Sequence, residues 1–325
     1  MPDKTLAFDL GGTNLRCAVV NRTGEIEVEQ RALTEGARGV DTVIEHMVEL
    51  IAEVASEADV DADTPIGVAA PGPLDPHSGV VRFSPNLPGW TDIPLRDRLE
   101  QGTGRKVHLG NDANSAALGE FYFGSAKDSN HLVYVALGTG FGGGVISNGQ
   151  LIDGINGLGG ELGHTCVNMD GPRCSCGASG CVEAYCSGWA IARDGQALVR
   201  SGRGDMIRDA AADPENIDAR AVADAAAAGD AASLLVLERA GHALGASLAN
   251  FANVFNPEMI VIGGGLARIG DNLLKPARQA FRMHALPAVA DAVTITDSTL
   301  GTKTGIYGAA AIVFHHDSSD SPASS

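Results

Sequence analysis

The hydrophobic pattern of the first third of the chain predicts a strand-rich α/β domain. A fully apolar run over Pro65–Ala70 that ends in Pro and Gly predicts a buried strand. Residues 40–55 repeat apolar side chains at helical spacing, with glutamates on another face, which predicts a helix. A strand at Lys106–Leu109 leads into a helix that opens at Asn111-Asp112. Three further strands, separated by turns, are expected at Lys4–Leu10, Leu15–Val20 and Ile26–Leu33.

A second cycle of the same pattern begins at residue 131. The strand His131–Leu137 breaks at the glycine-rich turn Gly138–Gly144 and resumes as Val145–Ser147. This repeats the strand, glycine turn and returning strand of residues 4–20. Such self-similarity predicts two duplicated α/β domains that face each other across a cleft. Beyond it, we expect helices over 187–200, 219–228 and 232–255, and a strand at Met259–Ile262.

The expected domain boundaries follow from this repeat. The first α/β domain is predicted to span residues 1–117, and the helix 302–314 is expected to rejoin it. The second α/β domain is predicted to span residues 118–300 and to carry a cysteine-bearing loop at 164–181. Residues 315–325 (HHDSSDSPASS) are polar and are expected to form a disordered tail.

Composition and charge exclude several classes of protein. The 325 residues include 40 Asp+Glu and 23 Lys+Arg, a formal net charge of −17, which opposes binding to a nucleic acid backbone. No apolar run reaches the roughly 18 residues that a membrane helix needs. The N-terminus enters a strand almost at once, so no signal peptide and a cytoplasmic location are expected. With 25 Asp and only 5 Lys, the surface is predicted to be halophilic; an ordinary acidic cytosolic enzyme is the alternative.

Three of the predicted strands end in glycine clusters, at Gly11-Gly12, Gly138–Gly144 and Gly263–Gly265. Glycine lets backbone N–H groups converge on an anion, so such turns suit phosphate groups. No G-x-x-x-x-G-K-[ST] motif occurs, which excludes a P-loop nucleotidase. Residues 138–143 match G-x-G-x-x-G, but a strand follows where a Rossmann site requires a helix. A threonine in each of the first two turns, at Thr13 and Thr139, favours the sugar kinase/actin type of site.

Three of the six cysteines form C-x-C-x4-C inside a glycine-rich loop, with a histidine ten residues upstream. One imidazole and three thiolates complete a tetrahedral Zn²⁺ shell of the structural kind, which fixes a loop and performs no chemistry. The predicted ligands are His164, Cys174, Cys176 and Cys181. Cys166 is the one substitute ligand, whereas Cys17 and Cys186 are expected to be buried small apolar residues.

Five segments together identify a family resemblance. Asp9–Asn14 (DLGGTN) and Leu137–Gly144 (LGTGFGGG) are similar to two phosphate loops, and Gly110–Asn114 resembles a catalytic G-N-D-A-N segment. Glu161–His164 matches E-x-G-H, and Cys174–Glu183 matches C-x-C-G-x-x-G-C-x-E. In their order along the chain, the five segments resemble those of the ROK family (repressor, open reading frame, kinase). The resemblance runs from residue 9 to about 265 and implies an actin-like fold of two α/β domains.

The resemblance implies ATP and Mg²⁺ as cofactors and phosphorylation of a hexose at its 6-hydroxyl, with Asp112 as the catalytic base. A carboxylate suffices for an alcohol when the proton leaves late in a loose transition state. Without the family match, helix N-capping is the commoner role for Asp112. The implied sugar ligands are Gly72, Asn86, Asn111, Asp112, Glu161, His164 and Glu183. The implied ATP site comprises Asp9, Gly11, Gly12, Thr13, Asn14, Gly138, Thr139, Gly140, Gly263, Gly264 and Gly265.

Two of these assignments carry further expectations. His164 would bind zinc through one ring nitrogen and leave the other for the sugar. Asp9 would hold a water on Mg²⁺, or else only stabilise its turn.

Glucose is the expected substrate, because Arg82–Gly89 (RFSPNLPG) resembles the stretch before the sugar loop in the family's glucokinases. Fructose, mannose and N-acetylmannosamine remain alternatives, and the phosphate loops leave ADP and polyphosphate open as donors. The family also contains sugar-sensing repressors, which resemble this chain but carry a DNA-binding segment before the first phosphate loop. Here Asp9 comes eight residues from the start, so we expect an enzyme. Resemblance alone implies a homodimer or homotetramer.

Overall fold

The computed structural model describes residues 2–84 and 86–319. Its first sheet is built from β1 (Lys4–Leu10), β2 (Asn14–Asn21), β3 (Ile26–Leu33), β4 (Ile66–Ala70) and β8 (Val107–Asn111). The strand order is β3-β2-β1-β4-β8. β1 runs antiparallel to β2, with Asp9 opposite Arg16, and parallel to β4. The strands predicted from the apolar runs are therefore present in this part of the chain.

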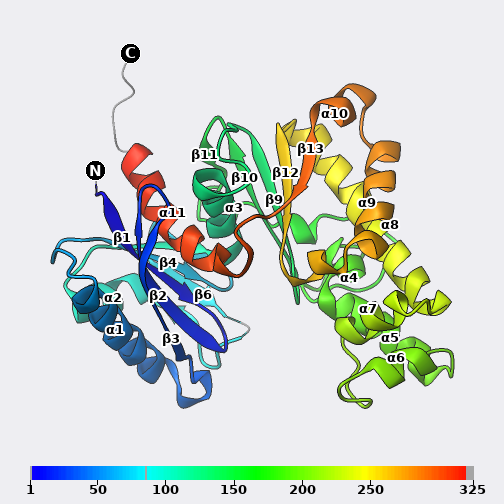
Figure 1. Ribbon diagram of the computed structural model, residues 1–325, viewed down its shortest axis with the longest axis horizontal. Helices are drawn as coiled ribbons and strands as arrows, with labels where there is room; N and C mark the ends of the chain where they lie inside the picture. The colour runs from blue at the N-terminus through cyan, green and yellow to red at the C-terminus, as the bar shows by residue number, and fades with distance from the viewer. Residues whose placement is uncertain (1, 85, 320–325) are drawn as a thin grey trace. The chain divides into compact units, whose positions relative to one another are not determined.

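Both faces of this sheet are covered by helices (Figure 1). On one face lie α1 (Val40–Glu57) and α2 (Leu95–Thr103), whose apolar side chains join those of the strands in one buried cluster. On the other face lies α11 (Thr304–Ser319), which packs with small residues such as Ala7 and Ala69. α3 (Asp112–Phe123) packs beside α11. The apolar periodicity of residues 40–55 thus marks a real core-facing helix.

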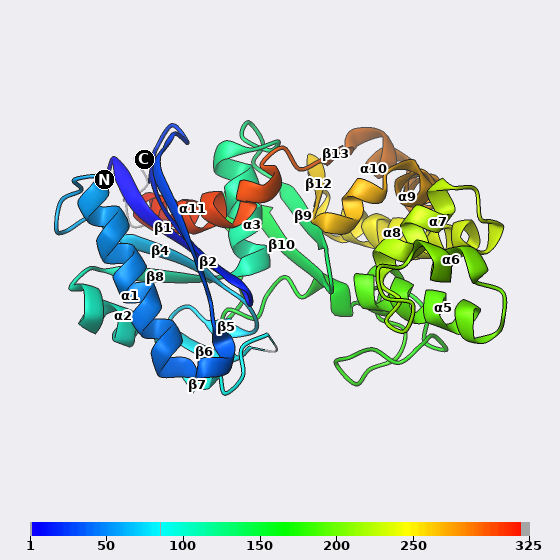
Figure 2. The ribbon, with the colours of Figure 1, turned by 60° about the horizontal axis from the view of Figure 1, so that its bottom comes forward.

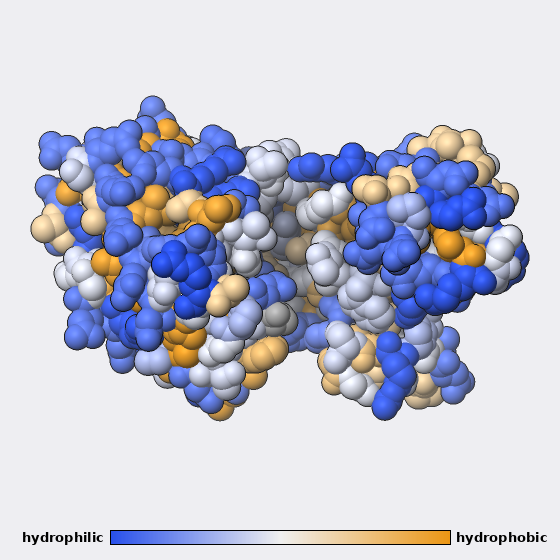
Figure 3. Space-filling view, turned by 90° about the horizontal axis from the view of Figure 1, so that it is seen from below, coloured by the Kyte–Doolittle hydropathy of each residue, from blue (hydrophilic) through white to orange (hydrophobic). Residues whose placement is uncertain are grey.

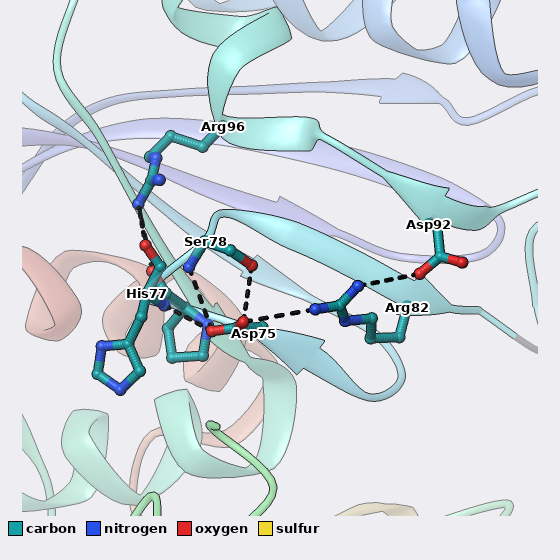
Figure 4. Close-up of polar contacts among 7 residues, drawn as sticks. Asp75, His77, Ser78, Arg82, Asp92 and Arg96 are labelled. Carbon is teal, nitrogen blue, oxygen red and sulfur yellow. Dashed lines mark hydrogen bonds and ion pairs between the residues drawn. The ribbon is translucent and has the colours of Figure 1, made fainter. Parts of the chain in front are cut away.

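A small three-stranded sheet, which the sequence analysis did not predict, follows β4. It consists of β5 (Leu74–Asp75), β6 (Val80–Phe83) and β7 (Thr91–Ile93), in that order. Polar side chains hold it together (Figure 4). The Asp75 carboxylate accepts hydrogen bonds from the Ser78 hydroxyl at 2.7 Å and from the His77 N–H at 3.0 Å. Arg82 lies between Asp75 and Asp92, at 3.5 and 3.2 Å.

The second large sheet repeats the topology of the first. Its strands are β9 (Leu132–Leu137), β10 (Phe141–Ser147), β11 (Gln150–Leu151), β12 (Met259–Gly263) and β13 (Thr294–Asp297). The order β11-β10-β9-β12-β13 matches β3-β2-β1-β4-β8 strand for strand. β12 is parallel to β9, as β4 is parallel to β1. The duplication predicted from the two strand–glycine turn–strand segments is therefore confirmed at the level of topology.

Seven helices belong to the part of the chain between residues 183 and 292. They are α4 (Glu183–Cys186), α5 (Gly188–Arg200), α6 (Asp205–Ala210), α7 (Ala219–Ala227), α8 (Ala231–Phe255), α9 (Asp271–His284) and α10 (Pro287–Ala292). Ser187, Asp218 and Asp230 cap α5, α7 and α8 with side-chain oxygens, as N-cap residues commonly do. α8 packs closely on α9, because Gly245 has no Cβ to collide with the Ala277 carbonyl. Short 3₁₀ turns are η1 (Gly36–Arg38), η2 (Leu162–His164), η3 (Gly265–Ile269) and η4 (Gly301–Lys303).

The chain divides into two compact units. The first comprises residues 1–129, 144–160 and the segment from Thr299 onward; the second comprises residues 130–143 and 161–298. The boundary expected after residue 117 falls inside α3, and the first unit continues to Ser129. The start of the expected tail is also different, because α11 continues to Ser319. His315 contacts the Tyr122 hydroxyl at 3.3 Å and Asp317 pairs with Arg22, which explains the longer helix; residues 320–325 lie outside the described residues.

The described helices include none that is long and apolar enough to cross a membrane. Figure 2 shows the same elements from another side, with α1 and α2 again lying against the first sheet. The face seen in Figure 3 is mostly hydrophilic, and its apolar residues form small separate patches.

Candidate active site and metal centre

The first glycine turn joins β1 to β2 in a tight hairpin. The Gly11 N–H donates to the Asn14 carbonyl at 3.0 Å, and the Thr34 hydroxyl donates to the Gly11 carbonyl at 2.7 Å. Gly12, Thr13 and Asn14 are exposed at the tip. The backbone conformation of the turn is thus fixed from behind, while its tip stays open to a ligand.

Asp9, the last acidic residue before this turn, occupies an unusual environment for a carboxylate. Burial raises its pKa, and the opposing Arg16 guanidinium lowers it in part. A Cβ at Gly305, in the first turn of α11, would collide with this carboxylate. Asp9 therefore lies between the first turn of α11 and Arg16, and the guanidinium offsets only part of the effect of burial on its pKa.

The second glycine turn joins β9 to β10 and is held by the start of α5. The Gly188 N–H donates to the Gly138 carbonyl at 2.9 Å, and the Trp189 N–H donates to the Thr139 carbonyl at 3.2 Å. Thr139 itself is exposed. The Phe141 N–H, just after the turn, donates to a carboxylate oxygen of Glu183 at 3.0 Å.

The third glycine cluster follows β12 and lies against β9. Gly264 has φ +89° and no room for a Cβ beside the Leu137 carbonyl, and Gly263 approaches the Tyr134 hydroxyl just as closely. Gly265 faces open space. The structure therefore brings Gly263 and Gly264, which the family resemblance assigns to the ATP site, beside the strand that leads into the second glycine turn.

The G-N-D-A-N segment spans the junction of β8 and α3. Asn111, not Asp112, is the N-cap of α3: its side-chain oxygen accepts from the Ala113 N–H at 2.9 Å. Its amide nitrogen donates to the Gly72 carbonyl at 3.0 Å. Asp112 is the first helical residue, is exposed, and accepts from the Ala113 N–H at 2.8 Å. The capping role that sequence alone allowed for Asp112 therefore belongs to its neighbour.

Two expected sugar ligands lie near these elements within the first unit. Gly72, at φ +87°, is fixed by Asn111 and lies against the Phe83 carbonyl, where a Cβ would collide. Asn86 lies against Gly12, because a Cβ on that glycine would come within 2.9 Å of the Asn86 Cβ. The first unit thus places Asn86 at its first glycine turn, and Gly72 beside Asn111 at the start of α3.

The four predicted metal ligands come together in the second unit. The side-chain donor atoms of His164, Cys174, Cys176 and Cys181 all lie within 4.8 Å of one another. Cys174 Sγ is 3.6 Å from His164 Nδ1, and Cys176 Sγ is 3.7 Å from Cys181 Sγ. Zn–S bonds of about 2.3 Å and Zn–N bonds of about 2.0 Å at tetrahedral angles require separations of about 3.8 and 3.6 Å. These two separations therefore agree with a tetrahedral metal ion, and the four donor atoms lie close enough together to share one.

The thiols of this cluster differ in their environments. Burial raises the pKa of Cys181 to about 12, and that of Cys174 is also raised by burial. A hydrogen bond from the Ala178 backbone lowers the pKa of Cys176. The substitute ligand Cys166 is exposed and is not part of the cluster. Cys17 and Cys186 are fully buried, as expected.

The remaining expected sugar ligands flank the metal cluster. Glu161 is exposed and precedes η2, and the His164 N–H donates to its carbonyl at 3.1 Å. His164 directs Nδ1 at the thiols, as the expected division between its two nitrogens requires. Glu183 is different: it is 7% exposed and makes contacts with the protein through both carboxylate oxygens. Its pattern of contacts was not predicted from the sequence.

The duplicated sheets, each with a glycine turn between its first two strands, define the class: an actin-like ATPase fold of the sugar kinase type. The profile of the ROK family matches residues 5–316, and the chain belongs to this family. It is 39% identical over 312 residues to a glucokinase of Thermotoga maritima, covering 95% of this chain and 97% of the relative.

Solved structures give the same result. The ROK hexokinase from Thermus thermophilus has a TM-score of 0.83 and 33% identity, covering 97% of this chain and 99% of that one. A ROK family glucokinase from Streptomyces griseus, in complex with glucose and AMPPNP, has a TM-score of 0.78 and 30% identity over 94% and 98% of the chains. A xylose repressor of Caldicellulosiruptor bescii is 30% identical, with 95% of this chain and 77% of the relative covered.

Proposed function

We propose that the protein is a glucokinase that transfers the terminal phosphate of ATP to the 6-hydroxyl of glucose. The observation that carries this proposal is the exposed Asp112 at the start of α3, with its helix capped by Asn111. Asn111 also donates a hydrogen bond to the Gly72 carbonyl. The proposed base, Asp112, and the sugar-loop residue Gly72 are therefore both positioned by Asn111. The names of the glucokinase relatives support the choice of substrate.

Asp112 would accept the proton of the attacking hydroxyl. As the first residue of α3, Asp112 lies at the positive end of the helix dipole, which favours a negative charge there. Because phosphoryl transfer has a loose transition state, most of the rate comes from alignment and from neutralised phosphate charge. The exposed tips of the two glycine turns, at Thr13 and Thr139, would supply backbone and hydroxyl hydrogen bonds to the phosphates.

Two metals fit the residues present. Mg²⁺ prefers carboxylates and water, and Asp9 offers such a carboxylate beside the first turn; the ion neutralises charge on the phosphates when bound. Zn²⁺ suits the one imidazole and three thiols of the cluster, two of whose separations match a tetrahedral shell. A closed shell of four protein ligands leaves zinc the role of fixing the loop 164–181. His164 would then present its second nitrogen to the sugar.

A coupled assay of ADP release with ATP and Mg²⁺ tests the function. Glucose, fructose, mannose and N-acetylmannosamine are compared by kcat/KM. A preference of about 100-fold for glucose, about 2.7 kcal/mol of differential transition-state binding, supports a glucokinase. Similar values for several sugars would identify a broad hexokinase. Absence of turnover with ATP would move the test to ADP and polyphosphate as donors.

A second candidate is a sugar-responsive regulator, because a xylose repressor matches 95% of this chain. Such a protein would bind a sugar without phosphorylating it. Sugar binding by calorimetry together with no ADP release from any donor would favour this candidate.

We further propose a homodimer or homotetramer, as the family resemblance implies, and a cytoplasmic location. The six free thiols suit a reducing compartment. Light scattering of the purified protein measures the oligomeric state.

A further inference from the structure

The carboxylate of Glu183, at the start of α4, is buried and bound from two sides. Oε2 accepts a hydrogen bond from the Phe141 N–H at 3.0 Å, just after the second glycine turn. Oε1 accepts one from the Ser175 hydroxyl at 2.9 Å and one from the Trp189 indole N–H at 3.4 Å. A buried carboxylate needs such partners, since charge removed from water is costly when it is left unpaired.

These contacts join two functional segments. Ser175 lies between the metal ligands Cys174 and Cys176, and Cys174 Sγ is itself 3.6 Å from Oε1. On the other side, a Cβ on Gly140 would come within 2.9 Å of Oε2, so the carboxylate also touches the glycine turn. The single side chain of Glu183 therefore contacts both the cysteine-bearing loop 164–181 and the second glycine turn.

Residues near Glu183 and His164 also contact the second glycine turn. Gly188 and Trp189, a few residues further on, donate their backbone N–H groups to the carbonyls of Gly138 and Thr139. Gly163, next to the ligand His164, packs directly against the Phe141 backbone, where a Cβ would collide. The backbone of the second glycine turn is thus held in place by residues that are next to the metal cluster.

We propose that Glu183 is a positioning residue for the nucleotide, and that through it the metal cluster sets the affinity of the second glycine turn for phosphate groups. The proposal rests on the proposed function in one respect, namely that this turn binds ATP. A phosphate-binding turn works through several N–H groups held in one geometry, so a looser support weakens binding. Glu183 then acts on the nucleotide in addition to any contact with the sugar.

The test removes the supports of Glu183 without changing Glu183. The double variant Ser175→Ala/Trp189→Phe deletes the hydroxyl and indole donors to Oε1, and it keeps the Cys174 thiol contact and the backbone contacts of residue 189. We expect AMPPNP to bind about tenfold more weakly by calorimetry, glucose affinity to change less than about twofold, and zinc content to stay the same. Hydrogen exchange of the peptide 138–144 should become faster at Phe141. Ser175→Thr, which keeps the hydroxyl, should restore most of the affinity lost in Ser175→Ala.

Tyr185→Phe is the matched control. It lies in the same short helix and removes a hydrogen bond of 3.1 Å from Asn168 of the metal loop without touching Glu183. AMPPNP affinity and exchange should keep wild-type values. An equal loss in this control would show general loosening of the loop and overturn the proposal.

Removal of zinc from the wild-type protein gives an independent measurement. Exchange at residues 138–144 should rise and AMPPNP affinity should fall, as in the double variant. If zinc removal weakens glucose binding but leaves both quantities unchanged, Glu183 does not connect the two segments. These measurements do not require turnover, so a failure to phosphorylate glucose would contradict the proposed function and still leave this proposal tested.

Discussion

At the scale of single residues, the division of work between Asn111 and Asp112 is the most informative feature. Both are polar, adjacent and at a strand-to-helix junction, and from sequence either one is able to cap the helix. The structure assigns the cap to Asn111, whose oxygen faces the Ala113 and Asn114 N–H groups. Asp112 is thereby left as the exposed first residue of the helix.

Replacing Asp112 with Asn should therefore affect chemistry and little else. We expect kcat to fall by about 10²–10⁴, the usual contribution of a general base, and glucose affinity to stay within about tenfold. Asn111→Ala, in contrast, should lose a helix cap worth about 0.5–2 kcal/mol and lower the Tm. The coupled assay, calorimetry with glucose and thermal unfolding measure these three quantities. Loss of glucose binding in Asp112→Asn would make its role structural.

Asp75 gives a prediction about pH. Hydrogen bonds from Ser78, first from its hydroxyl, hold the pKa of Asp75 below its usual value. A lowered pKa in the folded state adds stability above the unfolded pKa of about 3.9, and this stability is lost as pH falls through the folded pKa. Asp75→Asn should therefore reduce the free energy of unfolding at pH 7, and the difference from wild type should shrink below about pH 4.

Denaturant unfolding across this pH range checks the effect of Asp75→Asn. Asp92→Asn is the matched control, because Asp92 pairs with the same Arg82 but is 65% exposed. It should change stability by less than about 0.5 kcal/mol. A difference between Asp75→Asn and wild type that stayed constant from pH 7 to pH 3 would contradict the assignment.

Glu183 marks the limit of prediction from sequence at this scale. Its position in C-x-C-G-x-x-G-C-x-E led us to expect a sugar ligand. No pattern along the chain indicated that its carboxylate accepts a hydrogen bond from the Phe141 N–H, because that contact joins residues 42 positions apart. Spacing predicts local groups well, whereas contacts between distant segments depend on how the elements pack.

At the scale of elements, long apolar runs were the reliable signal. β1, β4, β9 and β12 are buried and apolar, and each was predicted within about one residue of its observed bounds. The sheet β5–β7 was missed, because its strands have two to four residues and depend on side-chain contacts such as that between Asp75 and Arg82. α2 was also missed, since it offers only two buried leucines among charged residues.

The cysteine-bearing loop 164–181 shows how far spacing along the chain can predict. The spacing of its histidine and cysteines correctly predicted that His164, Cys174, Cys176 and Cys181 come together. Cys176 is exposed, so its replacement removes a ligand without opening a cavity in the core. Cys176→Ser should reduce bound zinc well below one equivalent, lower the Tm and weaken glucose binding through His164. Metal analysis by mass spectrometry, thermal unfolding and calorimetry give the three values.

Cys166→Ser is the control for Cys176→Ser, because Cys166 is an exposed thiol of the same loop and lies outside the four-residue cluster. It should keep full zinc content and normal kinetics. Zinc loss in Cys166→Ser, or full zinc content in Cys176→Ser, would show that the ligand set is wrong.

At the scale of the whole molecule, duplication explains why the glycine turns occur in corresponding places of the two large sheets. Each large sheet has a glycine turn between its first two strands, and each turn carries a threonine. The two units differ in what they add: the first adds the G-N-D-A-N junction, and the second adds the metal loop. The repeat was visible in the sequence because β-strand, turn and β-strand are local. The boundaries were less visible, since residues 144–160 pack with the first unit.

The net charge of −17 gives the prediction that concerns the molecule as a whole. Like charges on a folded surface repel one another, and about 1 M salt shortens the screening length to about 3 Å. If the acidic, lysine-poor surface is halophilic, Tm and activity should both rise from 0.1 to 2 M KCl.

The dependence on pH separates charge screening from other salt effects. The net charge approaches zero near the sequence pI of about 4.8. If KCl stabilises the protein by screening its net charge, the increase of Tm per molar KCl should be large at pH 7.5 and small at pH 5.5, because the net charge is smaller at pH 5.5. An increase that is the same at both pH values would indicate preferential exclusion of salt from the surface. A maximum of activity at low KCl would instead identify an ordinary acidic enzyme. In such an enzyme, salt weakens the attraction between oppositely charged groups more than it relieves the repulsion among the acidic ones.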